Sequence, residues 1–146
     1  MNLWPPFLGA GIHVDEIGDD FRSAKVSLKL GLLNRNIAGV HFGGSLFAMT
    51  DPFFMMMVSQ NLGKQYIVWD RAARIEFLKP GKSDVYANFK INQDQIDALI
   101  LEAATGDKVL KDFSVNVINK EGEVIASITK TLYVRKKNQR LHNHEF

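Results

Sequence analysis

The stretch at residues 45–62, SLFAMTDPFFMMMVSQNL, is the most apolar part of this chain. Its hydrophobic side chains fall on nearly every side of a helical wheel, which is typical of a helix buried inside a protein. Thr50, Asp51 and the polar run at residues 59–61 make the stretch too polar, and its length makes it too short, to cross a bilayer. Gly63 follows at the position of a helix C-cap. We therefore predict one buried helix over residues 45–62.

Alternating apolar and polar residues predict strands on both sides of this helix. In residues 21–30, Ala24, Val26 and Leu28 alternate with polar side chains, which is the period of a half-buried strand. The same reasoning predicts strands over residues 9–14, 66–78, 84–91, 109–118 and 124–134, and a short helix over residues 93–105. The glycine- and asparagine-rich residues 31–44 are predicted as an irregular loop. This order predicts an α+β domain whose antiparallel sheet wraps around one long helix.

The size and composition of the chain indicate one globular domain. Its 146 residues are 46% hydrophobic, so we predict a single domain over residues 1–146 with a core at about 9–134. A net charge of +2 is too small to indicate nucleic-acid binding. The absence of cysteine and of a signal-like N-terminus fits a cytoplasmic protein. A helix that is apolar all round also needs more cover than one small domain supplies, which predicts a homodimer or a dimer of dimers.

The C-terminal end of the chain is rich in basic residues. Residues 135–146 are predicted as a basic tail, and the cations that crowd this end are Lys130, Arg135, Lys136, Lys137 and Arg140. Such runs attract phosphates, but most are solvated chain ends. His142 and His144 lack a carboxylate at a convincing spacing, so we predict no metal site.

Asp51 is the sharpest candidate for chemistry, because it lies in the middle of the apolar helix. If the helix is continuous, its neighbours one turn away are apolar, and a desolvated carboxylate suits a general base or nucleophile. Pro52 offers a structural alternative, since Asp-Pro is the sequence expected for the N-cap and first residue of a helix. Both interpretations stay open at this point. Gly43 and Gly44 add backbone amides that a ligand can approach closely, although a glycine pair is also ordinary turn chemistry.

The run at residues 36–51, NIAGVHFGGSLFAMTD, resembles the loop and central-helix start of hotdog-fold acyl-CoA thioesterases of the phenylacetate-pathway type. Their pattern is Asn, two residues, Gly, two residues, His-Gly-Gly, and an acidic residue seven places after the second glycine. The positions that keep this spacing are Asn36, Gly39, Gly43, Gly44 and Asp51. The predicted element order is also that of the hotdog fold, and residues 74–80, RIEFLKP, resemble the strand after the helix in that family.

The sequence departs from this pattern at one place. The family histidine before Gly-Gly is Phe42 here, and His41 stands one residue earlier. Versions with phenylalanine are more similar to an uncharacterised, thioesterase-like branch of the superfamily. His41 is therefore a candidate for either catalysis or loop hydrogen bonding. Dehydratases of the same fold carry His-Phe in this loop, but Met55 stands where their acidic residue would be, so dehydration is not supported.

The resemblance implies hydrolysis of acyl-CoA or another acyl thioester, without a cofactor. The Gly44 amide would polarise the carbonyl. Asp51, of the same or the neighbouring subunit, would activate water or attack, and Asn36 would orient water or substrate. Further substrate-binding candidates are Phe42 and Gly43 in the loop, Phe54 and Met55 beside the acyl chain, and Arg71, Arg74, Lys79 and Lys82 for the phosphates of CoA. The alternative is an acyl- or lipid-binding protein without catalysis.

Overall fold

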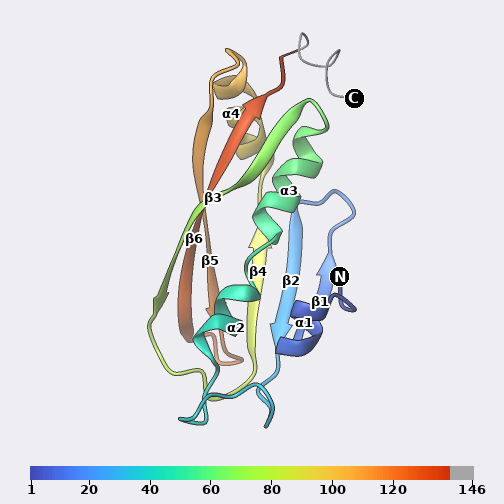
Figure 1. Ribbon diagram of the computed structural model, residues 1–146. Helices are drawn as coiled ribbons and strands as arrows, with labels where there is room; N and C mark the ends of the chain where they lie inside the picture. Colours follow the sequence, from blue (N-terminus) through green and yellow to red (C-terminus); the bar gives the residue numbers. More distant parts are fainter. Residues whose placement is uncertain (139–146) are drawn as a thin grey trace.

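The computed structural model describes residues 1–138, which form one antiparallel sheet with the helices α2 and α3 across one face (Figure 1). The six strands lie in the order β1-β2-β4-β5-β6-β3. The elements along the chain are α1 (Pro5–Ala10), β1 (Ile12–Ile17), β2 (Ser23–Leu28), α2 (Gly43–Ala48), α3 (Phe53–Leu62), β3 (Tyr66–Phe77), β4 (Val85–Lys90), α4 (Gln93–Ala103), β5 (Val109–Ile118) and β6 (Val124–Lys136). This is the predicted α+β architecture.

The central helical segment is interrupted, where one continuous helix was predicted. After α2 the chain continues in hydrogen-bonded turns. The amides of Met49, Thr50 and Asp51 donate to carbonyl groups of α2. Pro52 has no N–H and cannot extend this series, so α3 starts a new helix at Phe53. Gly63 is its C-cap, as the sequence predicted, and has φ 84°. The break places Asp51 between two helices.

The hydrophobic core lies between α3 and the sheet. The side chains of Phe53 and Phe54 are buried against Phe89 of β4, with ring centroids 4.8 and 5.2 Å away. Phe113 of β5 stacks on Phe54 at 5.3 Å. Met57, one turn further along α3, is also fully buried. These contacts fix α3 against the middle of the sheet, and with it the position of the preceding break.

The N-terminal prediction was wrong, because residues 5–10 form α1 and the first strand begins at Ile12. Pro5 and Pro6 occupy the first positions of α1, where a missing N–H costs nothing and the proline φ suits a helix. Gly11 ends α1 with φ 81°, a conformation that glycine adopts readily. The alternation predicted at residues 9–14 therefore applies only to its second half.

The C-terminal half agrees with the sequence, and β6 is longer than expected. A capping box at Asn92 and Gln95 starts α4, and the strands predicted over residues 109–118 and 124–134 pair as the hairpin of β5 and β6. Arg135 and Lys136 are the last residues of β6, and Lys130 is buried within it rather than belonging to a solvated end. Arg140, His142 and His144 lie outside the described residues. No helix within residues 1–138 is long and apolar enough to cross a membrane.

Candidate functional site

Asp51 is half-exposed at the break between α2 and α3. Its side chain is 50% exposed, which overturns the expectation of a desolvated carboxylate. The capping alternative is also wrong, because α3 has Pro52 at its N-cap and no side-chain capping bond. Instead, Oδ1 of Asp51 accepts a hydrogen bond from Nζ of Lys130 at 2.8 Å. The carboxylate is thus open to solvent on one side and held by a cation on the other.

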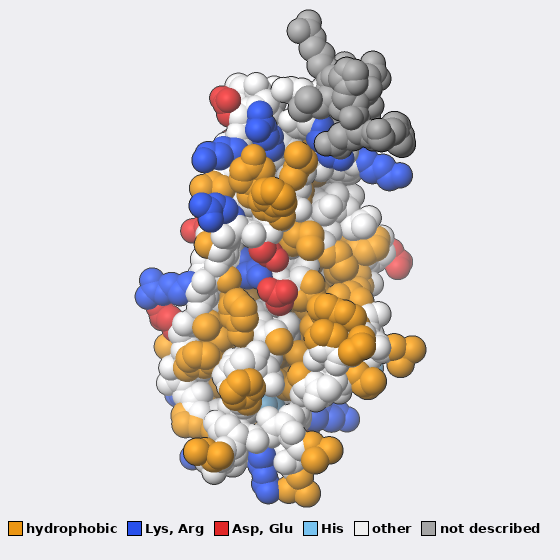
Figure 2. All heavy atoms as spheres, viewed as in Figure 1, with side chains coloured by type: hydrophobic (Ala, Val, Ile, Leu, Met, Phe, Trp, Pro, Cys, Tyr) orange, Lys and Arg blue, Asp and Glu red, His pale blue; other side chains and the backbone are white. Residues whose placement is uncertain are grey.

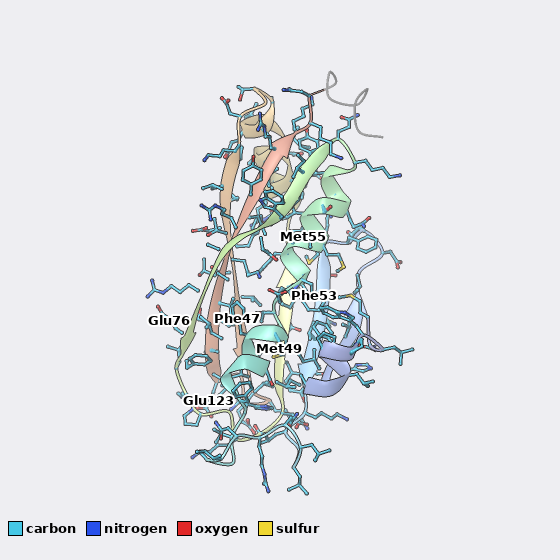
Figure 3. The ribbon with its side chains drawn as sticks, viewed as in Figure 1. Phe47, Met49, Phe53, Met55, Glu76 and Glu123 are labelled. Atoms are coloured by element: carbon cyan, nitrogen blue, oxygen red, sulfur yellow. The ribbon has the colours of Figure 1, made fainter. Side chains whose placement is uncertain are left out.

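Lys130 is the partner that holds Asp51, and it is buried. It lies in β6 opposite Ala73 and Phe113, on the side of the sheet that faces the helices, and only 1% of the residue is exposed. Its ammonium also lies 5.6 Å from the ring centroid of Phe47, a distance at which a cation is attracted to an aromatic face. Figure 3 shows Phe47 between α2 and the strands β5 and β6.

Asp70 is the second carboxylate beside this lysine. Its Oδ2 lies 3.4 Å from Nζ of Lys130, and its side chain is 28% exposed. Asp70 and Ala73 are separated by two residues and would point to opposite faces of a regular strand. A β-bulge between Asp70 and Ala72 lets both of them face the helices. Burial raises the pKa of Asp70, the charge of Asp51 raises it further, and Lys130 opposes both effects. Acidic side chains beside a basic one lie near the middle of an otherwise largely apolar face in Figure 2.

Lys130 and Asp70 were not predicted as site residues, yet the pattern of β6 contains a signal for the lysine. Ile128, Leu132 and Val134 are buried at alternate positions of β6, and Lys130 falls in the same series. A lysine at a core position of an alternating strand requires a buried counter-charge. Asp70 carried no comparable signal, because the bulge that directs it cannot be deduced from the period of β3.

The glycine pair at the start of α2 is packed against aromatic rings. A Cβ on Gly44 would lie 2.5 Å from the ring of Phe42, and a Cβ on Gly43 would lie 3.0 Å from the ring of Phe77. A side chain at Gly44 would therefore displace the exposed ring of Phe42, and one at Gly43 would make a tight contact with the exposed ring of Phe77. Within residues 1–138 the amide hydrogens of Gly43 and Gly44 have no acceptor, whereas those of the next two residues bond to the carbonyl of Phe42.

His41 and Asn36 shape the loop before α2. Nε2 of His41 lies 2.7 Å from the carbonyl oxygen of Ser83, so this nitrogen donates, and the ring packs on Gly81. Burial lowers the pKa of His41, and its Nδ1 is buried without a partner among the described residues. Oδ1 of Asn36 accepts from two amides of its own loop, at 2.9 and 3.2 Å. The observed contacts of both side chains are loop contacts.

A cavity of about 400 Å³ brings several predicted residues together. Asn36, His41, Gly43 and Lys79 line it, together with Phe77 at the end of β3. Asp51 does not belong to this lining. The cavity therefore adjoins the first turn of α2, whereas the carboxylate lies beyond the last turn of the same helix.

The other predicted substrate residues are spread over the molecule. Phe42 is exposed, Met55 is partly buried, and Phe54 is a core residue. Arg74 pairs with Glu76 at 2.7 Å and Lys79 with Glu123 at 2.6 Å. Figure 3 shows both of these acids away from the helical break. Arg71 and Lys82 are exposed and make no ion pair in the part of the chain that the structure describes.

Comparison with solved structures confirms the hotdog fold. A Pseudomonas aeruginosa protein described as of unknown function and a probable thioesterase superposes with a TM-score of 0.78 at 16% identity, covering 88% of this chain and 85% of that chain. A thioesterase from Haemophilus influenzae gives 0.67 at 17% identity, covering 96% and 87%. Another P. aeruginosa thioesterase, solved as a variant, gives 0.65 at 13% identity, covering 90% and 86%. At these identities the likeness concerns the fold.

Two comparisons at the level of sequence complete the assignment. No curated protein matches the chain. A family model described as a domain of unknown function, DUF4442, matches residues 1–134, which include every strand and helix of the structure except the last two residues of β6. The chain therefore belongs to the DUF4442 family of hotdog-fold domains.

Proposed function

We propose that this protein hydrolyses acyl-CoA or a related acyl thioester, with Asp51 as the reacting carboxylate. The observation that carries the proposal is the half-exposed Asp51 at the helical break, held by a buried lysine at 2.8 Å. A carboxylate that is both accessible and fixed in orientation is suited to attack or to general-base catalysis. The structural neighbours that are described as thioesterases support the same reaction class.

The chemistry requires one carboxylate and no redox step. As a general base, Asp51 takes a proton from water while the water oxygen bonds to the thioester carbonyl carbon. The carbon–sulfur bond then breaks, and the proton passes to the departing thiolate, which leaves a carboxylic acid and a thiol. As a nucleophile, Asp51 first forms an anhydride with the acyl group and releases the thiolate. Water then cleaves the anhydride, which restores the Asp51 carboxylate and frees the carboxylic acid, and a proton from that water converts the thiolate to the thiol.

The geometry of α2 favours a site made by two copies of the chain. Gly44 and Asp51 are separated by seven residues of helix and turn, which corresponds to roughly 10 Å along a helix. A carbonyl held at the Gly44 amide is therefore out of reach of the Asp51 carboxylate in the same chain. The partner's Asp51 would complete the site, with Asn36 and His41 holding the loop. Among the predicted cations, Arg71 and Lys82 are the more available for CoA phosphates.

The edge strand β3 offers the surface for this pairing. This twelve-residue strand pairs with β6 on one side only, and residues 71–74 are all exposed. A long edge with exposed Ile67, Trp69 and Phe77 is a template for another strand. We expect a homodimer of about 33 kDa, twice the 16.5 kDa of one chain, by light scattering.

Hydrogen exchange provides an independent check on the same interface. The outer amides of β3 should be protected at concentrations where the dimer forms and should exchange rapidly after dilution to monomer, while amides of α4 stay unchanged. A mass of one chain together with unprotected β3 amides would exclude the paired-edge dimer. A mass of four chains would indicate a dimer of dimers.

The reaction itself is tested with a panel of acyl-CoA thioesters of short, long and aromatic acyl groups. Release of free thiol is followed with a thiol reagent, and we expect turnover of at least one member of the panel. If no thioester is hydrolysed and the purified protein carries bound lipid or acyl groups, the protein is an acyl-binding protein and the hydrolase proposal is wrong. The cavity beside Gly43 would then be the first place to look for the ligand.

A further inference from the structure

The buried ammonium of Lys130 is more than a structural feature of the core. Two carboxylates from different elements converge on it, Asp51 from the helical break and Asp70 from β3. A buried lysine is stabilised by one good counter-charge, and here the protein supplies two. The bulge in β3 is needed to direct Asp70 to this place.

We propose that Lys130 and Asp70 are positioning residues with opposite effects on Asp51: Lys130 fixes the orientation of its carboxylate, and Asp70 partly offsets the Lys130 cation. The inference rests on the proposed function, in which Asp51 must be anionic to react. Neither positioning residue touches the substrate in this scheme. Lys130 acts by donating to Asp51 at 2.8 Å, and Asp70 acts through Lys130 at 3.4 Å.

The charged surroundings of the cluster determine the sign of each effect. Within 4 Å of the Lys130 ammonium, the described residues contribute two carboxylates, those of Asp51 and Asp70. Asp112 of β5 bonds to Thr131, whose side chain alternates to the other face of the sheet. The cluster therefore holds one positive and two negative charges when fully ionised. A cation beside a carboxylate favours its anion, and a second anion disfavours it.

Two substitutions should consequently move the acidic limb of the plot of kcat/KM against pH in opposite directions. Lys130→Met removes the cation beside the Asp51 carboxylate, so activity should fall away at a higher pH than in the wild type. Asp70→Asn removes the competing anion, so the limb should move to lower pH. Lys130→Arg keeps the charge and should keep the limb near its wild-type position. For Lys130→Met we also expect kcat to fall by about 10- to 100-fold while KM changes little, because an orienting contact is lost.

Controls of matched chemistry are available on an exposed ion pair. Lys25 of β2 and Glu16 of β1 form an exposed pair at 3.2 Å, at the end of the sheet opposite to β6 and β3. Lys25→Met and Glu16→Gln should leave both the limb and kcat unchanged. If Lys130→Met does not fold, the shift to lower pH in Asp70→Asn and the unchanged limb in Lys130→Arg still test the proposal.

The readouts separate this inference from the proposed function. A limb that stays within error for both Lys130→Met and Asp70→Asn overturns the inference, even if Asp51 proves essential for hydrolysis. If Asp51 is not essential, or no thioester is cleaved, the ¹³C resonance of the Asp51 carboxyl group is titrated by NMR instead. Opposite displacements of that titration in the two variants support the inference, and coincident titrations reject it.

Discussion

Replacing Asp51 by asparagine is expected to lower kcat/KM for acyl-CoA hydrolysis by about 10²- to 10⁴-fold, the usual contribution of a general base. Asparagine has nearly the same shape, and its amide oxygen can still accept from Lys130, so the helical break should keep its geometry. What it lacks is the negative charge that takes a proton from water or attacks the carbonyl. Steady-state kinetics with the best acyl-CoA substrate measures the loss.

A matched substitution separates catalysis from general effects of losing a carboxylate. Asp97 of α4 accepts a hydrogen bond from the side chain of Gln93 on the helix surface, away from the break. Asp97→Asn should therefore hydrolyse at the wild-type rate, and thermal unfolding should show that both variants are folded. Unchanged hydrolysis by Asp51→Asn would remove Asp51 from the mechanism and leave the fold assignment untouched.

Phe54→Ala should have the largest effect on stability, lowering the free energy of unfolding by about 3–5 kcal/mol. The Phe54 side chain is 2% exposed and contacts two other rings, Phe89 edge-on and Phe113 stacked. Alanine would leave a cavity between α3 and the sheet that the surrounding strands cannot fill. Urea denaturation at one fixed protein concentration measures the change, since subunit association would make stability depend on concentration.

The control for this prediction is a large apolar residue that lies on the surface. Leu101 of α4 is 77% exposed, and Leu101→Ala should change the free energy of unfolding by no more than about 0.5 kcal/mol. A loss below about 1 kcal/mol for Phe54→Ala would contradict the central place that the aromatic cluster has in this core. Such a result would also weaken the conclusion that α3 fixes the position of Asp51.

The sequence predicted most strands well, because a strand with one buried face shows a regular alternation of apolar and polar residues. In β5, Phe113, Val115 and Val117 alternate with polar residues and are all buried. The start of the chain was harder, since the glycine and apolar residues of α1 also fit the beginning of a strand. The proline pair that opens α1 was the informative feature there.

The candidate site was predictable only in part. Asp51 stood out from the sequence, but the spacing of apolar residues could not show whether the helix continues through Pro52, and that decides how exposed the carboxylate is. Lys130 was assigned to the basic chain end because basic residues follow it in the sequence. Its position in the alternating pattern of β6 nevertheless indicated an inward-facing side chain. Asp70 depends on a bulge, which is a property of two paired strands rather than of one.

That bulge has a consequence for the number of residues in β3. Asp70 pairs with Leu132 and Ala72 with Thr131, so Arg71 is the extra residue of the bulge. Deleting Arg71 would therefore leave a regular strand in which Asp70 and Ala73 still face the helices. Deleting Trp69 instead would reverse the facing of every residue on one side of the deletion, so that either Asp70 or the pair Tyr66 and Val68 would turn outward. Near the charge cluster, β3 can therefore lose a residue at the bulge but not in the regular part of the strand.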